Sequence, residues 1–171
     1  MEPISKEFVE RIWKETAALT HDRADSEMRA MGKNQPDLLA FLVTFTEDLG
    51  QEAKELAVYL GFVVYRMFLL TKGTVPRITS RTIMASYNEN ARMLKGPEGA
   101  GGRIPEKAAK TGSSVQPHVM SYIIEAVTEG AEEGDFEPGG EEATLLMMLL
   151  KTEIEALDRS LSLSRSSRKS L

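Results

Sequence analysis

Apolar residues recur every three or four positions through most of this chain of 171 residues. This spacing places them on one face of an α-helix, whereas a half-buried strand would show strict alternation. Helices are expected over about 5–20, 36–49, 51–71, 79–95, 117–128 and 141–161, with at most a short helix near 26–31 in the polar stretch 21–35. The pattern predicts an all-α, single-domain bundle of five or six helices.

Proline and glycine mark the expected helix ends. Pro36 and Pro117 suit a first helical turn, because the N–H that proline lacks would have no helical acceptor there. The glycine-rich stretch of about 96–115 is typical of a long mobile loop, and the Ser/Arg-rich stretch 162–171 is typical of a disordered basic tail. The domain is therefore expected to span 1–161, and the sequence shows no evident internal repeat.

The most apolar segment, 56–70, is shorter than the roughly 20 residues of a membrane-spanning helix and contains Arg66. It is better interpreted as a buried core helix. The first fifteen residues carry charges throughout and do not resemble a signal peptide. The absence of cysteine excludes disulfides, zinc fingers and a cysteine nucleophile. We expect a cytoplasmic protein that does not contact a membrane.

An acidic turn over 129–140 separates the last two predicted helices, an arrangement that calcium-binding loops share. Its candidate metal ligands are Glu133, Asp135 and Glu137. However, Ala131 and Gly140 stand where such a loop requires an oxygen ligand and a bidentate glutamate. The sequence therefore favours a solvated acidic turn, whose Glu141 and Glu142 offset the positive end of the last helix. No cofactor is predicted.

Basic residues cluster in two places, although the net charge is −5. The stretch 56–88 contains no acid, and within it Arg77 and Arg81 lie near an expected helix start. The tail adds Arg165, Arg168 and Lys169. Because such patches bind the phosphates of nucleic acids, a nucleic-acid-binding regulator that uses the basic 66–81 segment and the tail is one alternative. The acidic net charge opposes it.

The sequence contains no recognisable catalytic arrangement: no Gly-x-Ser-x-Gly, no Glu-x-x-His pair and no phosphate-binding glycine motif. By elimination we expect a non-enzymatic helical interaction module. Two strongly apolar helices and the run LLMMLL at 145–150 carry more apolar surface than a small bundle is expected to cover, which predicts a homodimer and leaves room for a protein partner. A small-ligand or metal-binding helical bundle is the second alternative.

Overall fold

The computed structural model describes residues 1–94, 115–134, 136–137 and 139–168, which form seven helices and no strand. The helices up to residue 72 are α1 (Lys6–Ala17), α2 (His21–Asn34), α3 (Pro36–Thr44) and α4 (Gln51–Lys72). The later ones are α5 (Ser80–Leu94), α7 (Pro117–Glu132) and α8 (Glu141–Arg168). The chain is one all-α helical domain, as its apolar spacing predicts.

Local sequence accounts for most of the helix boundaries. The Ser5 and Thr20 hydroxyls accept hydrogen bonds from the third backbone N–H of α1 and α2. Pro36 and Pro117 open α3 and α7, as expected. Gly73 ends α4 with φ of +77°, a left-handed conformation that side chains larger than hydrogen disfavour.

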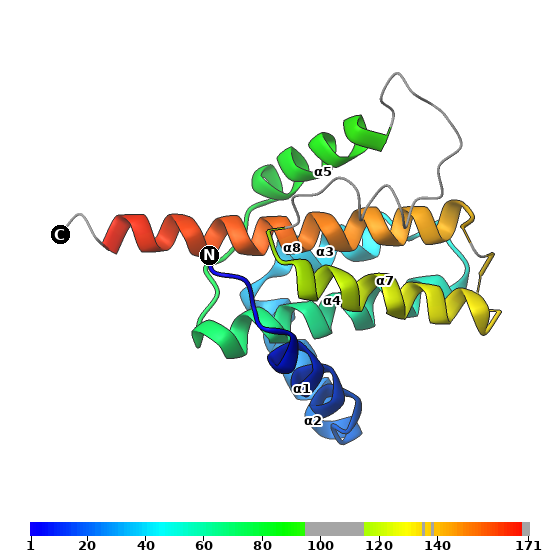
Figure 1. Cartoon of the computed structure of the whole chain (residues 1–171), viewed down its shortest axis with the longest axis horizontal. Coiled ribbons are helices and arrows are strands. Elements are labelled where there is room, and N and C mark those ends of the chain that lie inside the picture. The colour runs from blue at the N-terminus through cyan, green and yellow to red at the C-terminus, as the bar shows by residue number, and fades with distance from the viewer. Residues whose placement is uncertain (95–114, 135, 138, 169–171) are drawn as a thin grey trace.

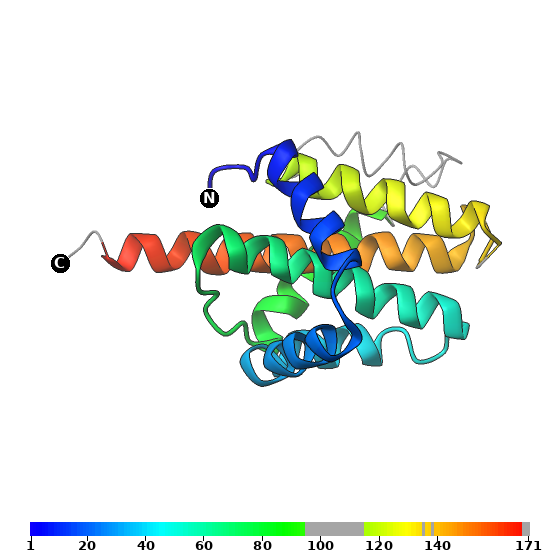
Figure 2. The ribbon, with the colours of Figure 1, turned by 90° about the horizontal axis from the view of Figure 1, so that it is seen from below.

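Helices α4 and α8 run side by side in the same direction through the centre of the molecule (Figures 1 and 2). Helix α7 packs against α8 in the opposite direction, and α5 and α1 lie on opposite sides of the central pair (Figure 1). The core follows from this arrangement. Residues 60–68 of α4 are all buried, and on α8 so are Leu146, Met147, Leu149 and Leu150.

The chain contains two equivalent halves, which we had not recognised in the sequence. Gln35 and Gln116 each precede a proline, are fully buried, and have φ of −133°. The Gln35 Oε1 accepts from the Ile78 N–H at 3.0 Å, and the Gln116 Oε1 accepts from the Ile4 N–H at 2.7 Å. Each glutamine therefore binds the extended segment that precedes the first helix of the other half.

Other contacts repeat in the same way. Helix α1 packs on α4 and α7, as α5 packs on α8 and α3. The stack of Trp13 on Tyr122 corresponds to the edge-on contact of Tyr87 with Phe41. From these repeated contacts, and because α4 and α8 are parallel neighbours, we infer an approximate two-fold relation between the two halves. The position that would correspond to α2 lies outside the described residues.

Three details of the predicted fold require correction. The described residues contain seven helices rather than five or six, because the polar stretch 21–34 forms the complete helix α2. Helix α8 continues seven residues past Leu161, to Arg168, into the stretch predicted as a tail. On α5 the buried positions include polar Ser86 and Asn90 beside Ile83. The predicted loop lies almost entirely outside the described residues, and so do 169–171 of the tail.

Candidate functional site

A groove of about 240 Å³ lies between α3 and α5, and we call it the α3–α5 groove. Its lining is mostly apolar, with an acid and a serine at one end: Asp37, Ala40, Phe41, Thr44, Phe45, Ser80, Ile83 and Met84. Just outside this lining, Val43 on α3 is 52% exposed. The groove and its surroundings are therefore an apolar surface that faces solvent.

Aromatic contacts at one end and a hydrogen bond at the other join α3 to α5 along the groove. The Phe45 ring lies 4.8 Å from the ring of Phe41 and 4.7 Å from the ring of Tyr87, measured between centroids. At the other end, a carboxylate oxygen of Asp37 accepts from the Ser80 N–H at 2.9 Å, which joins the starts of α3 and α5. Because both ends are fixed, the groove is a preformed feature of the bundle.

The segment that leads into α5 is fixed by Gln35. Its Nε2 donates to the carbonyls of Val75 and Pro76, at 3.3 and 3.0 Å. This positions Arg77 and Arg81 at the Ser80 end of the groove, where both are exposed and form no ion pair with a described residue. Exposed acids Glu47 and Asp48 follow Phe45 at the opposite end. Two exposed arginines thus lie near the end of the groove that holds Asp37 and Ser80, and two exposed acids follow the other end.

The equivalent surface between α1 and α7 has a different character. Glu10 replaces Met84, Glu125 replaces Thr44, and Ser121 replaces Ala40. Glu10 is exposed and its carboxylate lies 3.8 Å from the Lys6 ammonium group. Since the corresponding positions of the other half carry charged or polar residues, the apolar character of the α3–α5 groove is not a requirement of the fold.

Asn90 stands at the centre of a polar cluster that joins α5 to α8. Its Nδ2 donates to the Thr152 hydroxyl at 3.1 Å and to the Glu155 carboxylate at 2.8 Å. Its Oδ1 accepts from Lys151 Nζ at 2.5 Å, and Lys151 also pairs with Glu155. Because these groups satisfy one another, the cluster fastens α5 to α8 and offers no free catalytic group.

Arg66, part of the predicted basic segment, is not available to a nucleic acid. It is 7% exposed, and its guanidinium group donates to Glu27 at 2.6 Å and to the Thr16 hydroxyl at 2.6 Å. It therefore joins α4 to α2 and α1. Arg165 and Arg168 belong to the last turns of α8, and Lys169 lies outside the described residues.

The acidic turn does not bring metal ligands together among the described residues. Glu133 follows α7 directly, Glu137 is exposed, and Asp135 is outside the described part. No group of three or more potential ligands occurs in the part of the chain that the structure describes. The sequence predicts that Glu142 offsets the positive end of its own helix, α8. Its carboxylate also accepts a hydrogen bond at 2.8 Å from the Gly50 N–H, at the start of α4.

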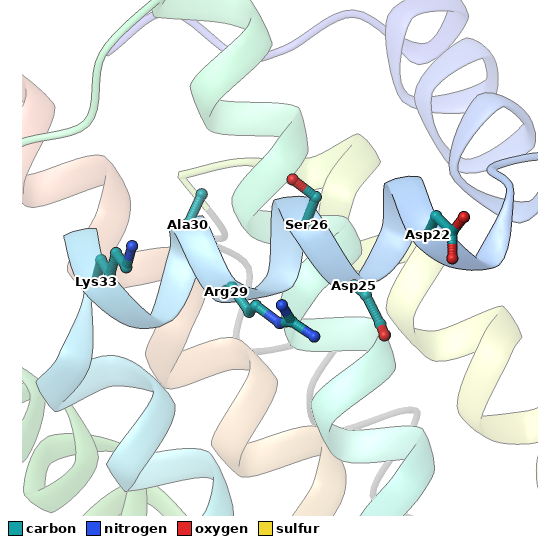
Figure 3. A pocket seen from close by; sticks show the side chains of 6 residues that line it. All are labelled: Asp22, Asp25, Ser26, Arg29, Ala30 and Lys33. Carbon is teal, nitrogen blue, oxygen red and sulfur yellow. The ribbon is translucent and has the colours of Figure 1, made fainter.

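A second hollow, of about 490 Å³, lies against α2 (Figure 3). All the described side chains that line it come from this one helix: Asp22, Asp25, Ser26, Arg29, Ala30 and Lys33. Every one of them is exposed, so the hollow is the solvated face of α2.

Comparison with family models, with curated proteins and with solved structures gives no match to this chain. None of the helices in the described ranges is long and apolar enough to cross a membrane.

Sequence reasoning had found Arg77 and Arg81 but not the groove beside them. Its two walls come from helices separated by α4, so no local motif marks it. The recurrence of Gln-Pro at 35–36 and 116–117, with Ile-Thr at 78–79 and Ile-Ser at 4–5, was a usable signal of the repeated halves.

Proposed function

We propose that this protein is a non-enzymatic helical interaction module that self-associates through the α3–α5 groove. The observation that carries the proposal is the contrast between the two equivalent surfaces. One carries the uncharged residues Ala40 and Thr44, both exposed, and the half-buried Met84, whereas the other carries Ser121, Glu125 and Glu10 at the corresponding positions. Exposed apolar surface of this kind is typical of a binding site.

The apolar helix runs from which the sequence predicts a homodimer are not the surface proposed here for self-association. The apolar runs of α4 and α8 are largely covered within one chain, since each half packs against the other. The groove, with Val43 exposed on the same helix, is one apolar surface that remains for a partner among the described residues.

The charges around the groove favour a second copy of the chain as the partner. In a two-fold pairing of two grooves, the basic end of one copy, with Arg77 and Arg81, meets the acidic end of the other, with Glu47 and Asp48. Such a pairing requires a hollow on one copy and an exposed apolar side chain on the other. The groove is the hollow, and Val43 is the exposed apolar side chain.

Sedimentation of Ala40→Glu and Ser121→Glu tests the proposal, because these two exposed positions are equivalent in the two halves. A glutamate at position 40 would be buried without a partner in the interface, at a cost of about 3 kcal/mol or roughly 100-fold in affinity. We expect dimers of the wild type and of Ser121→Glu, and monomers of Ala40→Glu. A wild type that stays monomeric, or equal behaviour of the two variants, would overturn the proposal.

A nucleic-acid-binding regulator is the alternative, favoured by the exposure of Arg77 and Arg81 on a segment that Gln35 fixes. Binding of DNA or RNA that weakens steeply with salt, and that is lost in the double variant Arg77→Ala with Arg81→Ala, would favour this alternative.

A further inference from the structure

Glu153 on α8 is an ionisable side chain enclosed in the core. It is 0% exposed, and neither of its carboxyl oxygens has a hydrogen-bond partner among the described residues. Buried polar atoms without partners are rare and costly in folded proteins. Glu153 is therefore unusual among the described residues, because it is an ionisable group that is fully buried without a hydrogen-bond partner.

Close packing confines the carboxyl group between α8, α4 and α3. A Cβ atom placed on Gly61 would lie 2.9 Å from Glu153 Oε2 and 2.4 Å from Leu42 Cδ1. With a larger residue at position 61, the ends of the Leu42 and Glu153 side chains would have to shift. The space is therefore fitted to this carboxyl group.

The equivalent position in the first half shows that the fold does not need a carboxyl group here. Gly50 and Gly140 precede α4 and α8, and Leu60 corresponds to Leu150, so Glu153 corresponds to Val63. Val63 is also 0% exposed. An apolar side chain satisfies this site in one half, whereas the other half carries an acid.

The charged groups on the neighbouring elements are engaged elsewhere. Arg66 on α4 pairs with Glu27. Asp37 on α3 accepts a hydrogen bond from the Ser80 N–H. Glu89 on α5 lies 3.9 Å from Arg159. Other ionisable groups on α4, α7 and α8 are also paired or exposed: Lys151 pairs with Glu155, Asp158 pairs with the terminal amine of Met1, Tyr65 is hydrogen-bonded to Asn34, and His118, Glu125, Glu129 and Glu132 of α7 are exposed.

Burial alone raises the pKa of Glu153 well above the ordinary value of 4.5. Desolvation favours the neutral form of an acid, and no opposite charge offsets it here. The carboxyl group thus keeps its proton in the folded protein at pH values where an exposed glutamate is ionised.

We propose that Glu153 is a proton-binding site built into the bundle core, and that release of its proton loosens the packing of α8 against α3 and α4. The geometry supports this directly. An ionised carboxylate in this space would have no hydrogen-bond donor among the described residues, and it would lie against the apolar side chain of Leu42 and the backbone at Gly61. Protonation and tight packing of these helices are therefore linked.

The direction of the pH dependence follows from the raised pKa. The stability that this group contributes is fully present below about pH 4.5, the pKa in the unfolded chain, and it is lost as the pH rises through the higher folded pKa. Between those two values the folding equilibrium constant falls by up to ten-fold per pH unit from this group alone.

Urea unfolding of the full chain at a series of pH values tests this, with Glu153→Gln, Glu153→Val and the exposed control Glu132→Gln. Valine copies the residue of the first half. We expect the wild type and Glu132→Gln to lose stability relative to both Glu153 variants as the pH rises above 4.5. Parallel pH profiles for all four proteins would overturn the proposal.

Carbon-13 NMR of the glutamate carboxyl groups measures the protonation of Glu153 in the wild type itself, so this test does not depend on the stability of the variants. The resonance that disappears in Glu153→Gln should retain the shift of a neutral acid in the wild type after the exposed glutamates have become ionised. If that resonance titrates with the exposed glutamates, Glu153 is not a proton-binding site of the kind proposed.

Discussion

Gln35 shows how much of this structure depends on single buried side chains. Its amide satisfies one backbone N–H and two backbone carbonyls of the segment that carries Arg77. Gln116 satisfies the Ile4 N–H and the Glu2 carbonyl of the N-terminal segment, and it also donates to Asp158 at 2.8 Å. A helical pattern does not reveal such groups, because their partners lie 40 or more residues away in the sequence and each looks like an ordinary N-terminal helix residue.

Gln35→Ala should lower the free energy of unfolding by about 3 kcal/mol, since it leaves the buried Ile78 N–H without an acceptor and two carbonyls without a donor. Urea unfolding measures the loss. The matched control is Gln51→Ala, which removes an exposed amide bonded only to Glu55 at 2.8 Å and should change stability by about 0.5 kcal/mol or less. A loss below about 1 kcal/mol for Gln35→Ala would contradict the role given to this residue.

At the scale of elements, α5 illustrates why the sequence predicts a helix more reliably than its buried face. The apolar stripe of Ile83, Tyr87 and Ala91 predicts a helix capped by Thr79 or Ser80, and α5 begins at Ser80. The buried stripe instead includes Ser86 and Asn90, because partners on α8 satisfy Asn90. The polarity of a side chain therefore predicts its burial poorly where a distant element supplies its hydrogen-bond partners.

Asn90→Ala should weaken the attachment of α5 to α8 by about 2 kcal/mol, because it removes three hydrogen bonds and leaves Lys151 and Glu155 with fewer partners. Hydrogen exchange of the α5 amides, together with thermal unfolding, would detect this. Asn88→Ala on the exposed side of the same helix serves as the control and should alter neither measurement appreciably. Equal effects of the two substitutions would argue against the polar cluster as the attachment of α5.

At the scale of the whole molecule, the two halves explain both the compact core and the proposed interface. Apolar helices that would expose their faces alone are covered by their counterparts, as α4 and α8 cover each other. The all-α class and the burial of the apolar segment in α4 followed from the sequence, because they depend on local spacing. The two-fold relation did not, because the equivalent residues have diverged, for example Trp13 to Tyr87 and Val63 to Glu153.

The most direct test of self-association through the α3–α5 groove uses the absence of cysteine from the chain. The substitution Ala40→Cys lies near the middle of α3, and Ser121→Cys is at the equivalent position on α7. In a two-fold pairing of grooves the thiols introduced at position 40 of the two copies lie close together, so a short bis-maleimide should join Ala40→Cys chains into covalent dimers at low protein concentration. Ser121→Cys should stay monomeric under the same treatment. Equal cross-linking of the two variants, or none in either, would contradict the account.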